Sequence, residues 1–177
     1  MEEPLIVSIG PHARSAVTTK RIMWAVALAL IPAGAAGVFI YGAKSLFIII
    51  AAVLSALATE IAIIGLRKKD MSAAFDGSGL LTGLLLAYNL PPDVPLWIPI
   101  AGSIFAVAIG KHVFGGLGHN IFNPALVGRA FLMISWPVYM TTWKNPRWKV
   151  YALTSATPLG LFKHGGSGLL RDVSNWD

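Results

Sequence analysis

The stretch IMWAVALALIPAGAAGVFIY, residues 22–41, contains no charged side chain. A helix needs about twenty such residues to cross a hydrocarbon core about 30 Å thick. The whole chain has the same character, because hydrophobic residues make up 55% of its 177 positions and charged residues only 12%, with a mean hydropathy of +0.67. Soluble domains carry about a quarter charged residues, and disordered chains are less apolar. The sequence therefore predicts an integral membrane protein.

Further apolar segments follow this first span. Residues 46–66 form a second continuous segment, in which Glu60 is the one ionisable residue. The stretch FDGSGLLTGLLLAYNLPP, residues 75–92, differs, because a polar, glycine-rich segment precedes an apolar helix of residues 80–90 that two prolines stop. That helix is too short to cross a membrane alone, and backbone that leaves a helix at membrane depth must be covered by protein or line a wet cavity. We therefore expect a broken helix here.

Two more spans complete the predicted membrane domain. One covers residues 96–109 or a little further, with Lys111 and His112 at its end, and the other covers residues 124–139. Asn123 and Pro124 have the residue types that favour the cap and the first position of a helix. The sequence thus predicts an all-α, polytopic helical membrane protein with about five transmembrane helices, including broken or re-entrant segments.

The basic residues divide the chain into three parts. We expect residues 1–21 to be a cytoplasmic N-terminal segment, residues 22–140 the five-span membrane domain, and residues 141–177 an extracytoplasmic segment. Positive residues close to span ends favour the cytoplasmic side. One side collects Arg14, Lys20, Arg21, Arg67, Lys68, Lys69 and Lys111, whereas Lys44 stands alone on the other before the last span ends.

Two ionisable residues fall inside the predicted spans. Glu60 has no basic residue at helical spacing in its own span, and an ionisable residue inside a membrane is a functional hypothesis by default. The alternative is that Glu60 lies near the headgroups or pairs with another helix, for example with Arg129. For Arg129 itself, extension of the long side chain to the membrane interface is the favoured interpretation.

Two glycine-rich stretches, residues 76–79 and 115–118, each precede a predicted helix. Such loops let backbone N–H groups approach an anion, although glycines also permit close helix packing, which is the favoured interpretation. The four histidines show no metal-ligand spacing, and the chain has no cysteine. We therefore assign no metal, no disulfide and no cysteine-held iron–sulfur cluster.

The segment TSATPLG, residues 154–160, lies in the predicted outer part of the chain. Pro158 favours an extended backbone at Thr157, which would present the threonine hydroxyl on an accessible loop. Taken alone, a segment of this composition is most often an ordinary loop.

Three stretches together resemble one known family. They are PHARSAVTTKRIMWAV (residues 11–26), DGSGLLTGLLLAYNLPPDVPLW (residues 76–97) and GKHVFGGLGHNIFNPALVGRAFLMISWP (residues 110–137). In this order they resemble the D subunit of the Rnf complex and the related B subunit of the sodium-pumping NADH:quinone oxidoreductase. The FNPALVGRAFL block is the most specific part of the likeness.

The resemblance implies a flavoprotein subunit of an ion-translocating electron transport complex. Family members carry FMN joined by a phosphoester bond to a threonine, and Thr157, preceded by Ser155 and Ala156, matches that position. Relatives often have glycine where this chain has Ser155. Glu60 lies where the related B subunit has a membrane carboxylate associated with cation uptake. A second, noncovalent flavin (riboflavin) is left open, with Asn120 and Asn123 as its candidate polar contacts.

The resemblance also implies an architecture and a set of partners. The family fold is an inverted repeat of five-helix units like that of urea transporters, and this chain is expected to be one half of it. The implied partners are the other membrane and peripheral subunits, including a second covalent-FMN subunit and iron–sulfur subunits, the lipid bilayer, and a flavin transferase, with no nucleic acid. The implied location is the bacterial or archaeal cytoplasmic (inner) membrane.

The leading hypothesis is therefore a membrane subunit of a ferredoxin:NAD⁺ oxidoreductase that couples electron transfer to Na⁺ or H⁺ translocation, inactive alone. The alternative is a transporter or channel subunit without a redox role, which the broken helices and Glu60 would also fit. A structural membrane anchor would explain the hydrophobicity but not the polar glycine loops.

Overall fold

Two long antiparallel helices begin the fold in the computed structural model, which describes residues 17–68 and 74–143. Helix α1 (Thr19–Tyr41) and helix α2 (Ala43–Leu66) are both long and apolar enough to cross a membrane. Between them, Gly42 has a φ of 94°, a value that favours glycine and allows the tight reversal. The Thr18 side chain accepts a hydrogen bond from Arg21 N, so α1 begins before the predicted first span.

Shorter helices complete the bundle. Helix α3 (Ser78–Tyr88) follows Gly77, whose φ is 88°, and ends before two prolines, so the broken helix is confirmed. Helix α4 (Trp97–Phe105) continues directly into a π-helix, η2 (Ala106–His112). This combined helix ends at His112, which agrees with the prediction of a span that runs a little beyond residue 109 and has Lys111 and His112 at its end.

The prediction of one continuous helix over residues 124–139 is wrong. Helix α5 (Pro124–Ser135) ends at Trp136, whose φ and ψ of −138° and 64° are not helical, and a short helix α6 (Pro137–Thr141) follows. The reason is Pro137, because a proline ring disfavours the helical conformation at the residue before it. At the other end, Asn123 caps α5 as expected, since its Oδ1 accepts a 3.0 Å hydrogen bond from Ala125 N.

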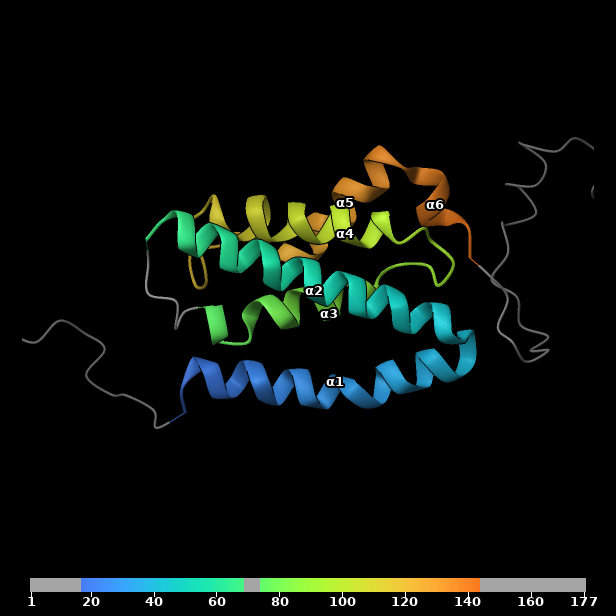
Figure 1. The fold of residues 1–177 in the computed structure, drawn as a ribbon, viewed down its shortest axis with the longest axis horizontal. Helices are drawn as coiled ribbons and strands as arrows, with labels where there is room; N and C mark the ends of the chain where they lie inside the picture. The colour runs from blue at the N-terminus through green and yellow to red at the C-terminus, as the bar shows by residue number, and fades with distance from the viewer. Residues whose placement is uncertain (1–16, 69–73, 144–177) are drawn as a thin grey trace, which may run out of the picture.

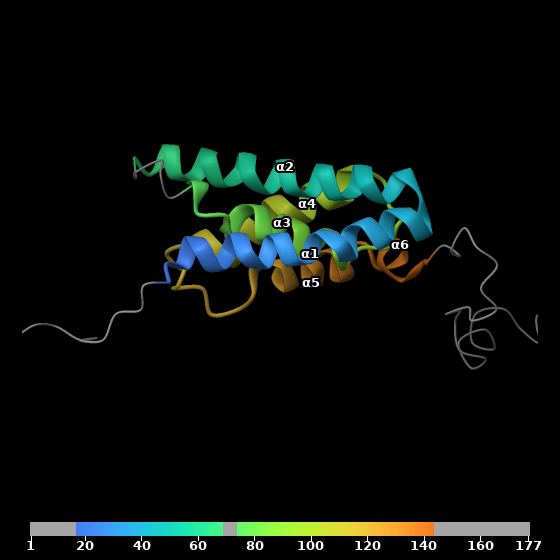
Figure 2. The ribbon, with the colours of Figure 1, turned by 90° about the horizontal axis from the view of Figure 1, so that it is seen from below.

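Helix α2 packs on α1, α3, α4 and η2, and Figures 1 and 2 show all these helices extending along the same long direction. Its buried positions recur every fourth residue, which places them on one face of a helix. They are Ile48, Ala52, Ala56, Glu60 and Ile64. Helix α5 covers the opposite side of α4 and η2, and the fully buried Leu86, Ile98 and Leu132 join α3, α4 and α5 in one apolar core.

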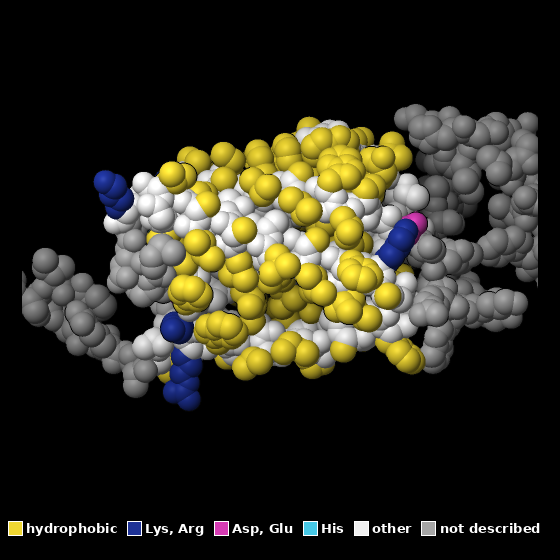
Figure 3. Space-filling model, in the orientation of Figure 1, with side chains coloured by type: hydrophobic (Ala, Val, Ile, Leu, Met, Phe, Trp, Pro, Cys, Tyr) yellow, Lys and Arg dark blue, Asp and Glu magenta, His cyan; other side chains and the backbone are white. Residues whose placement is uncertain are grey.

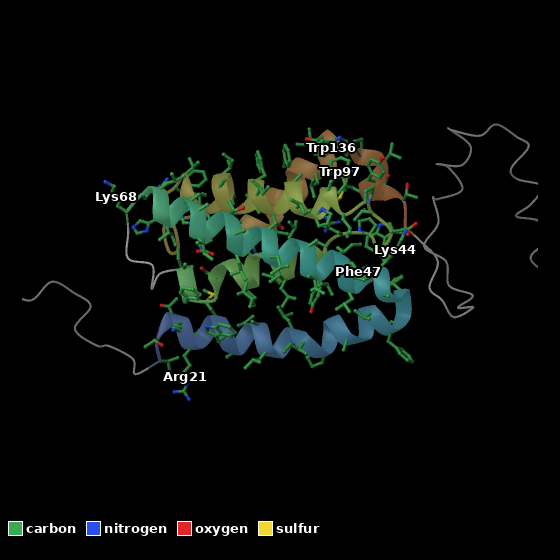
Figure 4. All side chains as sticks on the ribbon, viewed as in Figure 1. Arg21, Lys44, Phe47, Lys68, Trp97 and Trp136 are labelled. Atoms are coloured by element: carbon green, nitrogen blue, oxygen red, sulfur yellow. The ribbon has the colours of Figure 1, made fainter. Side chains whose placement is uncertain are left out.

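The outside of the bundle is apolar along its sides and charged at its ends. Figure 3 shows hydrophobic side chains spread over the face in view, with lysine and arginine confined to the two ends. Leu28, Phe39 and Leu54 are each more than 60% exposed. Figure 4 places Arg21 and Lys68 at one end and Lys44 at the other. Large apolar side surfaces between charged ends are typical of a helical membrane protein.

Aromatic rings gather toward the Lys44 end of the bundle. Trp97 and Trp136 meet edge to face with ring centroids 4.9 Å apart, and Figure 4 shows both near this end. Tyr139 contacts Trp97 in the same geometry at 6.0 Å. Tryptophan and tyrosine are enriched where a membrane protein meets the headgroup region, so a cluster at this end of the bundle is typical of a helical membrane protein.

Candidate functional site

A buried ion pair joins α2 to η2. The Lys111 ammonium donates a hydrogen bond to Glu60 Oε1, and the two residues are only 2% and 1% exposed. Glu60 lies six residues before the end of a 24-residue helix, or about 9 Å along the axis at 1.5 Å per residue. The pair therefore lies inside the bundle and away from its end.

The start of α3 adds further polar groups to this pair. Ser78 Oγ lies 2.5 Å from Lys111 Nζ and 3.4 Å from Glu60 Oε1. The same hydroxyl donates a 2.5 Å hydrogen bond to Asp76 Oδ1, which also accepts one from Ser78 N at 2.7 Å. We call Glu60, Asp76, Ser78 and Lys111 the polar cluster. It joins three segments that are far apart in the sequence.

Small residues on α3 bring this cluster together. A Cβ atom at Gly79 would overlap Glu60 Oε2, and a Cβ at Gly83 would lie 2.7 Å from Val53 Cα on α2. Glycines spaced by four residues lie on one face of a helix and permit close backbone approach in membranes. The close approach of α3 to α2 is therefore what positions Ser78 beside Glu60.

The π-helix positions the cation of the cluster. Within η2 the hydrogen bonds skip one more residue than in an α-helix, as in the 3.1 Å bond from Val113 N to Ala108 O. Such insertions change the direction of the side chains that follow and are frequent at functional sites. His112, the next residue, places Nε2 4.0 Å from Glu60 Oε1.

A cavity of about 390 Å³ adjoins the polar cluster. Ser78 and Lys111 form part of its wall, as do Thr82 on α3 and both Asn120 and Asn123 in the loop before α5. The remaining lining is mainly apolar and includes Met23, Leu117 and Phe122. Ligand sites typically combine an apolar wall with a few polar groups in a volume of this size.

Comparison with known proteins connects this geometry to a family. The sequence model described as "NQR2, RnfD, RnfE family" matches residues 6–177. The chain belongs to this family. The resemblance inferred from the three quoted stretches is thereby confirmed.

Similar relatives of this family member belong to ion-translocating complexes. It is 50% identical over 168 residues to the D subunit of the proton-translocating ferredoxin:NAD(+) oxidoreductase complex of Clostridium ljungdahlii, covering 94% of this chain and 50% of the relative. It is 46% identical over 169 residues to the D subunit of the Na(+)-translocating ferredoxin:NAD(+) oxidoreductase complex of Acetobacterium woodii, covering 93% and 51%. It is 45% identical over 141 residues to the D subunit of the ion-translocating oxidoreductase complex of Citrobacter koseri, covering 79% and 40%. The chain spans about half or less of the length of these curated relatives.

Arg129 of this family member is not the partner of Glu60. Its Nη1 donates a 2.8 Å hydrogen bond to Oδ1 of Asn89 at the end of α3. Glu60 does pair with another helix, as one alternative expected, but the example of Arg129 is wrong, because the partner is Lys111 on η2. The sequence pattern does not indicate Lys111 as this partner, because it predicts a basic residue beside a span end, whereas Lys111 is buried. Its position at the end of an apolar segment does not predict burial, because a lysine there normally extends its ammonium group to the membrane interface.

The two glycine-rich stretches have different roles. Gly79 in the first permits close packing against Glu60, as the favoured interpretation expected. In the second, Gly115, Gly116 and Gly118 have φ values of 116°, 106° and 88°. They therefore allow a turn that other residues would strain.

The remaining predicted site residues fall into two groups. Asn120 and Asn123 meet at the cavity, where Asn120 Nδ2 donates a 2.9 Å hydrogen bond to Phe122 O. Thr157, Ser155 and Ala156 lie outside the described residues. Within residues 17–68 and 74–143, no group of three or more histidine, aspartate or glutamate residues is placed to hold a metal ion.

Proposed function

We propose that this chain is a membrane subunit of an ion-translocating oxidoreductase complex of the ferredoxin:NAD⁺ type, and that it couples electron transfer to the movement of Na⁺ or H⁺. The match of residues 6–177 to the family model is the observation that carries the proposal. Similar relatives are named as subunits of complexes that translocate protons or Na⁺. The chain is expected to act only within that complex.

Glu60 is the proposed ion-pathway residue. It is a carboxylate held inside the bundle, and such residues in membrane proteins commonly mark routes for ions. The adjoining cavity supports this role, since a path for a cation requires polar atoms that face an open space.

Thr157 is the proposed attachment point for FMN, through a phosphoester bond to its hydroxyl. Ser155 and Ala156 are the small neighbours that would let a flavin transferase approach. When bound, FMN supplies the electron-transfer chemistry, and a covalent link keeps it at a fixed place in the chain.

A second, noncovalent flavin such as riboflavin is proposed for the cavity beside the polar cluster. The residues present fit this kind of ligand, because most of the lining residues are apolar while Asn120, Asn123 and Lys111 add polar residues to the wall. In this role the two asparagines would orient the ligand by hydrogen bonds, and Phe122 would offer an apolar contact.

The proposal includes a location and a set of partners. The chain would lie in a bacterial or archaeal cytoplasmic (inner) membrane with residues 1–21 in the cytoplasm and residues 141–177 outside. Arg21 and Lys68 at one end of the bundle support that orientation. The partners would be the other subunits of the complex, including a second covalent-FMN subunit and iron–sulfur subunits.

In-gel flavin fluorescence tests the redox part of the proposal. The chain is expressed in membranes together with its flavin transferase, denatured, and compared with a Thr157→Ala variant. Fluorescence in the parent band and none in the variant is the expected result. A dark parent band, beside another substrate that the same transferase labels, would contradict it.

A transporter or channel subunit without a redox role is the second candidate. The buried polar cluster and the short helix α3 favour it independently of any flavin, because broken helices and intramembrane charges also occur in transporters. Covalent flavin distinguishes the two candidates, since a simple transporter has no use for it.

A further inference from the structure

The polar cluster holds more negative than positive charge. Glu60 and Asp76 are two carboxylates that both reach Ser78 Oγ, and Lys111 is the one ammonium group that faces them within the described part of the chain. His112 stands 4.0 Å from Glu60 and offers a second positive charge only when it is protonated. Glu60 is buried and paired with Lys111, whereas Asp76 is half-buried, so the second carboxylate lies at the edge of the pair and attracts a further cation.

We infer that the oxygen atoms of Glu60, Ser78 and Asp76 form a binding site for a monovalent cation, and that the Lys111 ammonium group occupies this site until such a cation displaces it. The inference rests on the proposed ion translocation and adds a role for Lys111. In this arrangement Lys111 is a competitor for the site, and its withdrawal is a step that cation entry requires.

The donor atoms suit a hard cation. Lys111 is held by Glu60 Oε1 and by Ser78 Oγ, which are oxygen donors of the kind that hard cations prefer. A further oxygen, Glu60 Oε2, is buried and has no hydrogen-bond partner among the described residues, although Glu60 is only 1% exposed. A carboxylate oxygen with a free lone pair inside the bundle can contribute to a cation's coordination shell without the loss of another bond.

The cavity gives Lys111 a place to move. Lys111 and Ser78 both line it, so the lysine and one of the residues that hold its ammonium group border the same open space. The lysine stem is flexible and its ammonium group is compact, which allows a swing about the side-chain torsions. Thr82 adds another hydroxyl on the same wall, although it already donates a 2.8 Å hydrogen bond to Ser78 O.

The second lysine pair of the described chain provides a matched control. Lys44 and Asp93 form an ion pair at 2.5 Å, but their side chains are 66% and 41% exposed. Water screens such a pair, and a cation gains little by replacing the lysine there. The Lys44→Met variant removes the same group from a surface position.

Equilibrium Na⁺ binding tests the inference in the assembled complex purified in Na⁺-free buffer. NaCl is titrated by calorimetry, with choline chloride as the reference salt, into the parent and into Lys111→Met, Lys44→Met and the double variant Glu60→Gln/Lys111→Met. If Lys111 fills the site nine-tenths of the time, its removal should tighten Na⁺ binding about tenfold. Lys44→Met should bind like the parent, and the double variant should lose the binding. Equal or weaker binding by Lys111→Met, or retained binding by the double variant, would overturn the inference.

A measurement on the parent protein decides the question if Lys111→Met fails to fold. Reductive methylation followed by mass spectrometry should modify Lys111 more in NaCl than in choline chloride, while Lys44 is modified equally in both. Equal modification of Lys111 in the two salts would overturn the inference. Neither measurement needs an electron donor, so both test the cation site independently of redox activity. Absence of ferredoxin-dependent activity would refute the proposed function without contradicting the cation site.

Discussion

Gly83 on α3 lies against the backbone of α2 at Val53, so that a Cβ atom at Gly83 would be 2.7 Å from Val53 Cα and 2.8 Å from Ala52 O. Both neighbours are backbone atoms, which cannot move aside as a flexible side chain can. Residue 83 therefore sets the separation of the two helices that carry Ser78 and Glu60.

Gly83→Ala should destabilise the protein. Overpacking of this kind typically costs roughly 1–3 kcal/mol, because the helices must shift apart. Thermal unfolding of the purified protein measures the change, and Gly37→Ala is its control, since a Cβ there would meet nothing within 4 Å. Gly37→Ala should be neutral or slightly stabilising, because alanine is the better helix former. Equal unfolding temperatures for both variants would contradict the close approach.

Gly79→Ala should act through Glu60. The added methyl group would occupy the place of Glu60 Oε2, so the carboxylate must turn away from its present position. In a Glu60→Ala background this overlap is absent, and the same substitution should cost less. A double-mutant cycle on the free energy of unfolding should show a coupling of roughly 0.5–3 kcal/mol, and additive effects would contradict the contact.

Arg129 and Asn89 should be energetically coupled. Their 2.8 Å hydrogen bond joins α5 to the end of α3, and bonds to charged groups are worth roughly 1.5–3 kcal/mol in proteins, with smaller values common in membranes. Arg129→Met and Asn89→Leu, alone and together, measure this coupling by thermal unfolding. Arg129→Met should also leave Na⁺ binding at the polar cluster unchanged, because Arg129 does not contact Glu60. A large effect of Arg129→Met on Na⁺ binding would contradict this and indicate contact between Arg129 and Glu60.

Asn123→Ala should lose about 1 kcal/mol of stability, because the cap on Ala125 N disappears. Asn123→Ser should keep most of the stability, since a serine hydroxyl caps a helix equally well.

Flavin content separates this structural role from the proposed contact with a noncovalent flavin. If Asn123 orients the ligand, Asn123→Ser should retain the helix yet lower the amount of noncovalent flavin that co-purifies. Unchanged flavin content in Asn123→Ser would count against that contact.

Much of the fold was open to prediction because membrane helices depend on local properties. An apolar run of sufficient length and a proline or glycine at its end suffice to place a helix, and α1, α2 and α3 follow these signals closely. The break at Trp136 was missed although Pro137 is a local signal, because the apolar pattern continues across it. The backbone conformation of a single residue decides such a break, and a hydrophobicity pattern contains no information about that conformation.

The candidate site was predictable only in part. Glu60 stood out because a carboxylate in an apolar span is costly without a partner, and Asn123 because its type and place fit a helix cap. Lys111 did not stand out, since a lysine at the end of a span is ordinary. Its burial depends on η2, whose extra residue per hydrogen bond changes the direction of the side chain, and no pattern in the sequence announces a π-helix.

The sequence by itself determined that this is a helical membrane protein of the family that includes RnfD, because composition, span length and the order of three stretches are properties of the chain alone. The tertiary structure alone decided which charges meet. Glu60 and Lys111 are 51 positions apart, and they pair because Gly79 and Gly83 let α3 approach α2 while η2 directs the lysine inward. Contacts between distant segments depend on how the helices pack, and a sequence shows only the residues that make such packing possible.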